Sequence, residues 1–308
     1  MAELLSFPHD SAGPKSRFHP GHVGETIERP QRRTLEAASQ PSAGIVDIEY
    51  SQAFRNVRSL LSVFTEMGKP VKMDDAVLDF GCGEGRMVYA FRKLGYRAFG
   101  TDIAPPSEEA EGLIRAEGLC RPREQPLTLI HAEDYKIPFD NERFDFVVSW
   151  DVMEHVQHHA EALSEINRVL KRGGRSPHFF PSRYCILEPH IGVPLGTVLQ
   201  GYSYLYLWAL LGLRDKSQPT RTAREVARKN YEFLRTETKY LSKRRFVKLA
   251  DGSFRDIEFV EKHFWKHNGG KGQFIYKILS KLGLVKLVPF AASLLSPFGY
   301  RALFFLKP

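Results

Sequence analysis

Cysteine is scarce in this chain. The 308 residues contain three cysteines, Cys82, Cys120 and Cys185, and they lie far apart. Their spacing matches neither a zinc-binding motif nor a disulfide framework, which excludes a small fold held together by either. The first residues also lack the charged-then-apolar pattern of a secretion signal. We therefore expect a reducing, cytoplasmic setting.

Two further features are missing or nearly so. Carboxylates and histidines form no set with the spacing of a dedicated metal site, so we predict no metal ligands and no metal requirement. One long uncharged run does occur, residues 195–213, and its length would admit a membrane span. Its tyrosines, tryptophan and polar residues favour a helix buried against the domain or in a homodimer, with a helix at a membrane interface as the alternative.

The composition fits a large globular domain with an uneven charge. An apolar content of 43% is enough for one α/β core. Residues 211–308 contain 21 Lys or Arg against 8 Asp or Glu, whereas residues 1–210 are slightly acidic. Residues 221–248 predict a long charged helix, and residues 274–286 a basic amphipathic segment. Such a segment suits peripheral contact with an anionic membrane.

The most informative stretch is residues 77–86. A short apolar run ends at Asp79, and glycines follow at positions 81, 83 and 85. This pattern predicts a buried strand that turns sharply into a helix, where glycine lets a ligand approach the main chain and permits positive φ. The spacing differs from the dinucleotide motif, and Asp79 is suited to accept hydrogen bonds from the amine of an amino acid. S-adenosylmethionine is therefore favoured over NAD.

Strand and helix patterns follow in regular alternation. Asp102 ends the second predicted strand, 17 positions beyond Gly85, near the spacing at which nucleotide-binding folds place a ribose-binding acid. Strands are predicted at 77–80, 96–102, 127–131, 144–150, about 175–180, about 254–260 and within 301–307. Helices are predicted at 51–67, at 84–94, after 105–107 and after Asp151, the last ending at Gly173 and Gly174.

Over residues 77–174 these pieces resemble the class I S-adenosylmethionine-dependent methyltransferases, type 11. The resemblance implies an α/β, Rossmann-like sheet of seven strands with helices on both faces, an antiparallel last strand and a C-terminal helical addition. It implies S-adenosylmethionine as cofactor and S-adenosylhomocysteine as product. Asp102 would bind the ribose hydroxyls, and Glu133 or Asp134 the adenine amine. The other implied cofactor-binding residues are Asp79, Gly81, Cys82, Gly83, Gly85, Ile103 and Trp150.

The chain outside this core is assigned by composition. Residues 1–43 are rich in proline, glycine and serine and predict an arm, either disordered or folded over the cofactor as a lid. Residues 44–308 form the predicted methyltransferase domain. Helical additions at about 195–250 and 262–298 are expected to build the acceptor site.

The acceptor is predicted from the loop at residues 182–194, which should leave the carboxyl edge of the sheet. Its residues 188–194 resemble a segment of bacterial surface-polysaccharide methyltransferases. We therefore predict O-methylation of a sugar hydroxyl on a bacterial glycan or glycolipid precursor. A hydroxyl needs a base, and the candidates are His155, one turn into the helix after Asp151, and His190 in the loop. Asp151 and Glu188 are the candidates to orient the base or to bind hydroxyls.

Three alternatives stay open. One is a methyltransferase acting on a small molecule, quinone or lipid, which would have a closed apolar acceptor pocket. Another is an RNA methyltransferase, suggested by the basic C-terminal third. The sequence has no recognised RNA-binding module, so nucleic acid is not the expected partner. The last is a non-catalytic protein that binds S-adenosylmethionine, against which the intact glycine turn and both acids argue.

Overall fold

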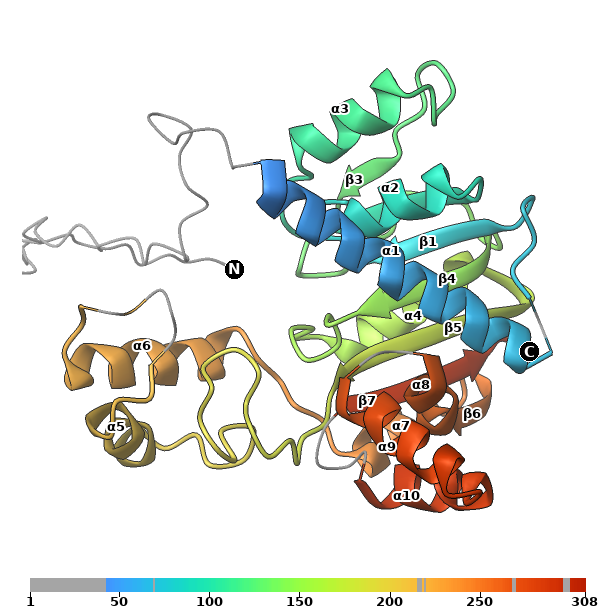
Figure 1. Ribbon diagram of the computed structural model, residues 1–308. Helices are drawn as coiled ribbons and strands as arrows, with labels where there is room; N and C mark the ends of the chain where they lie inside the picture. Colours follow the sequence, from blue (N-terminus) through green and yellow to red (C-terminus); the bar gives the residue numbers. More distant parts are fainter. Residues whose placement is uncertain (1–42, 69, 215–217, 219, 268–269, 296–299) are drawn as a thin grey trace, which may run out of the picture. The chain divides into compact units, whose positions relative to one another are not determined.

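The computed structural model describes residues 43–68, 70–214, 218, 220–267, 270–295 and 300–308. The predicted N-terminal arm, apart from its last residue, lies outside the described residues. The described chain is built on a seven-stranded sheet with the order β3-β2-β1-β4-β5-β7-β6 (Figure 1). The strands are β1 Ala76–Phe80, β2 Arg97–Asp102, β3 Leu127–Leu129, β4 Phe144–Trp150, β5 Leu170–Pro181, β6 Arg255–Phe259 and β7 Tyr300–Leu306.

The strand directions agree with the sequence-based expectation. β1 pairs in parallel with β2 and β4, and the parallel set continues to β3 and β5. β7 lies antiparallel between β5 and β6. The carboxyl ends of β1, β2, β4 and β5 therefore meet at one edge of the sheet, where ligands bind in doubly wound folds.

Helices cover both faces of the sheet. The helical elements are α1 Ala43–Glu66, α2 Arg86–Lys93, α3 Glu108–Ala116, α4 His159–Val169, α5 Tyr202–Leu210, α6 Ala223–Thr236, α7 Lys243–Ala250, α8 Glu261–His267, α9 Gly270–Lys281, η1 Val285–Leu287 and α10 Val288–Leu295. One core joins β1 and β4 to α1, α2, α3 and α8 through side chains such as Val77 and Phe64. The opposite core joins Leu78 and Phe80 to α4 and α7.

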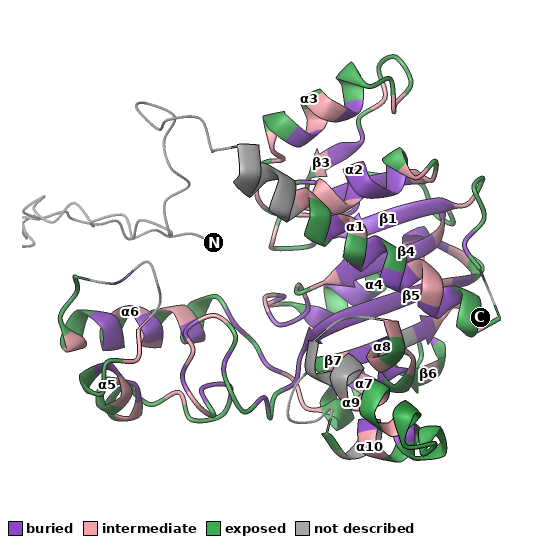
Figure 2. Cartoon of the chain, in the orientation of Figure 1, coloured by how far each residue is buried: buried purple, intermediate pink, exposed green. Residues whose placement is uncertain are grey.

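The apolar runs of β1 and β4 explain this architecture. Successive side chains of a strand point to opposite faces, so a central strand covered on both sides is apolar throughout. All five residues of β1 are buried, and Figure 2 shows the central strands in the colour of buried residues. The exception in β1 is Asp79, which is an acid and yet buried.

A smaller core holds the helical part between β5 and α7. Leu205 and Ala209 of α5 pack with Val226 and Leu234 of α6. Within the 195–213 run only residues 202–210 are α-helical, and large apolar side chains such as Leu199, Leu210 and Leu211 are exposed. The choice between a buried helix and a helix at a membrane interface therefore stays open. No helix among the described residues has both the length and the apolar character needed to cross a bilayer.

Three sequence-based boundaries were wrong. The α4 helix ends at Val169 rather than at Gly173 and Gly174, and β5 begins at once. Gly173 has a φ of 71° inside that strand, where the pairing register with β4 shifts. The glycines lie in the strand instead of ending the helix. The Gly173 amide donates to O of Lys307, the residue after β7, so Gly173 is already bonded to the neighbouring strand. The α1 helix also begins earlier than predicted, at Ala43.

The predicted helix over 221–248 is two helices. Thr222 and Glu225 form a capping box that starts α6, and Ser242 caps α7 by accepting the Arg245 amide. Between them the chain leaves helical geometry at Glu237, and the Lys239 amide donates to Glu154 O. The segment between the two helices is thus tied to the end of β4, which a charge pattern cannot predict.

Candidate active site

The turn after β1 is tied to the end of β2. The amide of Gly81 donates to Thr101 O at 2.7 Å. The amide of Gly83 donates to Oδ2 of Asp102 at 2.6 Å, and the Ala104 amide donates to Oδ1 at 2.8 Å. The carboxylate of Asp102 therefore fixes the shape of the turn. Each of its oxygens has a second lone pair with which it can accept a ligand hydroxyl.

The three glycines of the turn differ in their surroundings. All have positive φ, which favours glycine. A Cβ on Gly81 would lie 2.4 Å from the Val152 side chain, and one on Gly85 would lie 2.5 Å from Leu127. A Cβ on Gly83 would meet nothing within 4 Å. The sequence predicted that all three make room for a ligand, but protein side chains fill the space at the outer two. Only Gly83 faces open space.

Asp79 lies in β1 with 3% of its surface exposed. Burial, reinforced by the negative charge of Asp102, raises the pKa of Asp79 to about 7. A cation beside this carboxylate would offset both effects. A buried acid next to the open glycine turn is therefore suited to the ammonium group of an amino-acid moiety.

The predicted adenine side is open to solvent. Ile103 follows Asp102 and is exposed, and so are Glu133 and Asp134. Oδ1 of Asp134 accepts the Lys136 amide at 3.1 Å, which uses part of its hydrogen-bonding capacity in a local turn. The choice of adenine-binding acid stays a prediction, open between Glu133 and Asp134.

Cys82 and Trp150 pack against the edge of the sheet. Sγ of Cys82 lies 2.7 Å from the place that a Cβ on Gly100 would take, so the thiol faces β2. Burial raises the pKa of this thiol well above its usual range, which makes it a poor nucleophile. Trp150 stacks on Phe179 with ring centroids 4.8 Å apart.

His155 and His190, 35 residues apart in sequence, meet beyond the end of β4. Their Nε2 atoms are 3.1 Å apart. Nδ1 of His155 donates to Glu237 O at 2.7 Å, and Nδ1 of His190 lies 2.7 Å from Oε1 of Glu188. Burial lowers the pKa of His155. The correction here concerns the local structure: His155 lies in a turn before α4, not inside a helix.

Glu188 supports His190 from behind. Its side chain is fully buried, and it accepts the amides of His190 and Ile191 and the hydroxyl of Tyr240, the last at 2.5 Å. Burial alone would raise the pKa of Glu188, but the hydrogen bonds from His190 and Tyr240 outweigh it and hold the pKa below its usual range. A charged Glu188 fixes His190 with its proton on Nδ1 and leaves Nε2 as an acceptor.

Two acids complete this cluster. Asp151 has a φ of 55° directly after β4 and is accessible to solvent, yet the protein packed around it raises its pKa to about 6. Glu154 is buried, and burial together with the charge of Asp151 raises its pKa to about 8. Sequence reasoning named Glu188 as a candidate beside the base and missed Glu154 and Tyr240 as parts of the site. Glu154 carried a signal, because it directly precedes His155, whereas Tyr240 was expected on a continuous helix.

Comparison with known proteins supports the methyltransferase fold. The family described as methyltransferase domain matches residues 78–176, from β1 into β5. Residues 78–176 are therefore similar to a methyltransferase domain. This match agrees with the resemblance inferred from the glycine turn and the strand-ending acids, and with S-adenosylmethionine as the cofactor that the resemblance implies.

Similar proteins match the chain over a limited stretch. An uncharacterized methyltransferase of Schizosaccharomyces pombe is 36% identical over 114 residues, 36% of this chain and 41% of the relative. A ubiquinone biosynthesis O-methyltransferase of Thiobacillus denitrificans is 33% identical over 98 residues, 32% of this chain and 40% of the relative. The chain thus spans less than half the length of these relatives.

A solved structure covers more of the chain at lower identity. The structure of a SAM-dependent methyltransferase from Archaeoglobus fulgidus aligns with 87% of this chain and 100% of its own, with a TM-score of 0.43 and 14% sequence identity. The resemblance of residues 188–194 to surface-polysaccharide methyltransferases has no support in these comparisons.

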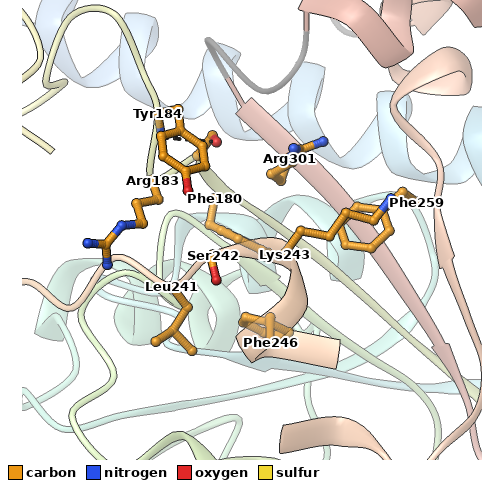
Figure 3. A pocket seen from close by; sticks show the side chains of 10 residues that line it. Phe180, Arg183, Tyr184, Leu241, Ser242, Lys243, Phe246, Phe259 and Arg301 are labelled. Carbon is orange, nitrogen blue, oxygen red and sulfur yellow. Dashed lines mark hydrogen bonds between the residues drawn. The ribbon is translucent and has the colours of Figure 1, made fainter. Parts of the chain in front are cut away.

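A recess beyond the end of β5 adds a polar surface to the methyltransferase domain. Figure 3 shows its lining: Phe180, Ser182, Arg183, Tyr184, Leu241, Ser242, Lys243, Phe246, Phe259 and Arg301. Lys243 extends toward the Phe259 ring, with Nζ 4.1 Å from its centroid. Arg301 pairs with Glu261 at 3.1 Å. The recess is therefore cationic and partly aromatic.

Proposed function

We propose that the protein transfers the methyl group of S-adenosylmethionine to a hydroxyl oxygen of a polar acceptor. The acceptor class that we favour is a sugar on a bacterial glycan or glycolipid precursor. The observation that carries this proposal is the placement of two sets of groups at one sheet edge. The Asp79–Asp102 cofactor turn lies at the ends of β1 and β2, and the His155–His190 pair lies beyond the neighbouring β4.

The reaction is a direct displacement. The acceptor oxygen attacks the methyl carbon in line with the carbon–sulfur bond. That bond breaks, and its electron pair stays on the sulfur, so the sulfonium becomes a neutral thioether. The hydroxyl proton must leave at the same time. His190 is held with Nε2 as an acceptor by the charged Glu188 behind it, and Asp151 lies at the end of the adjacent strand. These groups are our candidates for receiving the proton.

The surroundings favour a polar acceptor over an apolar one. The recess lined by Arg183, Lys243 and Arg301 is cationic, which suits hydroxyl, phosphate or carboxylate groups. We therefore propose that the helical segments from α5 to α7 build the acceptor side.

One observation favours a second candidate. A relative at 33% identity is named for ubiquinone biosynthesis, so a phenolic small molecule stays a candidate acceptor. That match covers only 32% of this chain. Similarity over part of a fold does not determine the acceptor, because one fold serves many substrates.

We also propose contact with anionic membranes through the C-terminal helices. Large apolar side chains are exposed from the end of α9 into α10, with Leu282 at 64% and Phe290 at 69% exposure, and Lys281 and Lys286 lie among them. Apolar side chains interleaved with lysines are typical of a segment that lies on a bilayer surface. Sedimentation with anionic vesicles, but not with neutral ones, would support this contact. If the protein sediments equally with both kinds of vesicle, or with neither kind, the proposed membrane contact is refuted.

The test of the proposed function is transfer of labelled methyl groups. The protein and labelled S-adenosylmethionine are incubated with a bacterial extract, which is then separated into small molecules, lipids, polysaccharide and RNA. Label in polysaccharide or glycolipid supports the proposal. Label in quinones or small metabolites supports the second candidate, and label in RNA contradicts both. The Asp102→Asn variant is the control, because it should lose transfer into every fraction.

A further inference from the structure

His155 and His190 face each other in an arrangement that two neutral imidazole rings cannot hold without a further proton or a metal ion. Nδ1 of His155 contacts a carbonyl oxygen, Glu237 O, which only accepts, so this nitrogen carries the proton. Nδ1 of His190 contacts the Glu188 carboxylate in the same way. If both rings are neutral, the Nε2 lone pair of His155 points at the Nε2 lone pair of His190. At 3.1 Å these lone pairs require a proton or a metal ion between or beside them.

A third donor points to a metal ion. Glu154 is 2% exposed, and neither of its carboxylate oxygens has a hydrogen-bond partner among the described residues. Its Oε1 lies 3.9 Å from Nε2 of His155, too far for a hydrogen bond. The ligand atoms of Glu154, His155 and His190 all lie within 4.8 Å of one another. A buried acid is costly without a charge or hydrogen bond to offset it, and a bridging proton between the histidines leaves Glu154 unexplained.

The distances suit a first-row transition metal. Two imidazole nitrogens bound at about 2.0–2.1 Å with a tetrahedral angle are about 3.3 Å apart, close to the separation found here. Histidine ligands of such metals donate their other ring N–H to a carboxylate or carbonyl, as both do in this site. Magnesium prefers oxygen ligands throughout, so two imidazoles argue against it.

We propose that Glu154, His155 and His190 form a binding site for a divalent first-row transition metal, of the Zn²⁺ type. Glu188 and Glu237 orient the two imidazoles from behind. The site itself does not depend on any methyl acceptor. Its role in transfer rests on the proposed function: a metal there would bind the acceptor hydroxyl and lower its pKa, which would leave Asp151 to receive the proton.

The proposal is tested on the full chain after treatment with a chelator. Zn²⁺ is titrated by calorimetry, and Co²⁺ serves as a spectroscopic probe because protein-bound Co²⁺ absorbs visible light according to its ligands. We expect one equivalent to bind, and Mg²⁺ to compete poorly. His190→Gln and Glu154→Gln should abolish this binding. Glu188→Gln should weaken it by about 10- to 100-fold, the effect typical of groups that orient a ligand.

The matched control is His158→Gln, which changes an exposed histidine in the same loop. It should bind Zn²⁺ like the unmodified protein. Circular dichroism of each variant in chelator separates loss of the site from loss of the fold. Absence of stoichiometric binding in the unmodified protein, or equal loss in His158→Gln, would overturn the proposal. Titration with S-adenosylmethionine is run in parallel: cofactor binding without metal binding refutes the metal site alone, whereas metal binding without cofactor binding refutes the proposed function alone.

Discussion

Replacing Asp79 by asparagine should stabilise the cofactor-free protein at alkaline pH. Burial and the charge of Asp102 raise the pKa of Asp79 from 3.8 to about 7. In the unfolded chain the group has its ordinary pKa, so ionisation opposes folding. This effect is absent below about pH 4 and increases until the pH passes about 7. At 1.36 kcal/mol per pKa unit, it reaches about 4 kcal/mol as an upper value.

The assay is urea unfolding of the unmodified protein and of Asp79→Asn at several pH values between about 5 and 8.5, without cofactor. The difference in unfolding free energy should be small at the acid end and grow with pH to a few kcal/mol in favour of the variant. Asp74→Asn, an exposed acid just before β1, is the control and should change little. With S-adenosylmethionine present the order should reverse, because its ammonium group pairs with Asp79 and not with asparagine.

Two results would refute this reasoning. If Asp79→Asn and the unmodified protein are equally stable at pH 8.5, the ionised Asp79 carboxylate does not lower the unfolding free energy. If the difference does not depend on pH, the variant acts through packing rather than through charge. A stabilising change that removes cofactor binding would show that Asp79 is retained for function at the expense of stability.

Further predictions concern the turn and the helix start. Gly85→Ala should lose about 1–3 kcal/mol of unfolding free energy in urea, because its Cβ would collide with Leu127 at positive φ; unchanged stability would contradict the packing described. Gly83→Ala should lose less stability, since its Cβ meets open space, but should weaken S-adenosylmethionine binding at least tenfold by calorimetry (~1.4 kcal/mol) if that space holds the cofactor. Thr222→Ala should lower the unfolding free energy by about 1 kcal/mol in the same urea assay, because it removes the capping box of α6. If the loss is smaller than that caused by replacing an exposed threonine elsewhere, the cap does not stabilise the helix.

The parallel half of the fold was predictable because its signals are local. Short apolar runs that end in an acid or a glycine determined β1, β2 and β4 to within a residue or two. Each run is buried on both faces, so its composition alone marks it as a central strand. The antiparallel last strand was confirmed as well, but that expectation came from the resemblance to a family rather than from the residues of β7.

The second half of the site was predictable only in part. His155 and His190 were chosen for their chemistry, and the structure brings them together. Glu188 and Tyr240 became part of the site through a loop and a helix break. That break depends on the Lys239 amide reaching Glu154 O, a contact between residues 85 positions apart. Charge patterns describe the solvent-facing side of a helix and carry no information on such a contact.

The metal-ligand cluster shows the same difficulty. No metal motif was expected, because Glu154 and His155 are adjacent while His190 lies on a separate loop. Spacing rules identify sites whose ligands share one helix or turn, whereas this cluster is assembled by the packing of the 182–194 loop against the end of β4.

The central claim is that the edge formed by β1 and β2 binds S-adenosylmethionine. Calorimetric titration of the purified protein and of Asp102→Asn tests it most directly, with Asp74→Asn as control. We predict binding of one equivalent, and affinity about 10- to 100-fold lower in Asp102→Asn, as expected for the loss of charged hydrogen bonds to the ribose. The absence of binding to the unmodified protein, or equal affinity in a folded Asp102→Asn variant, would contradict the claim.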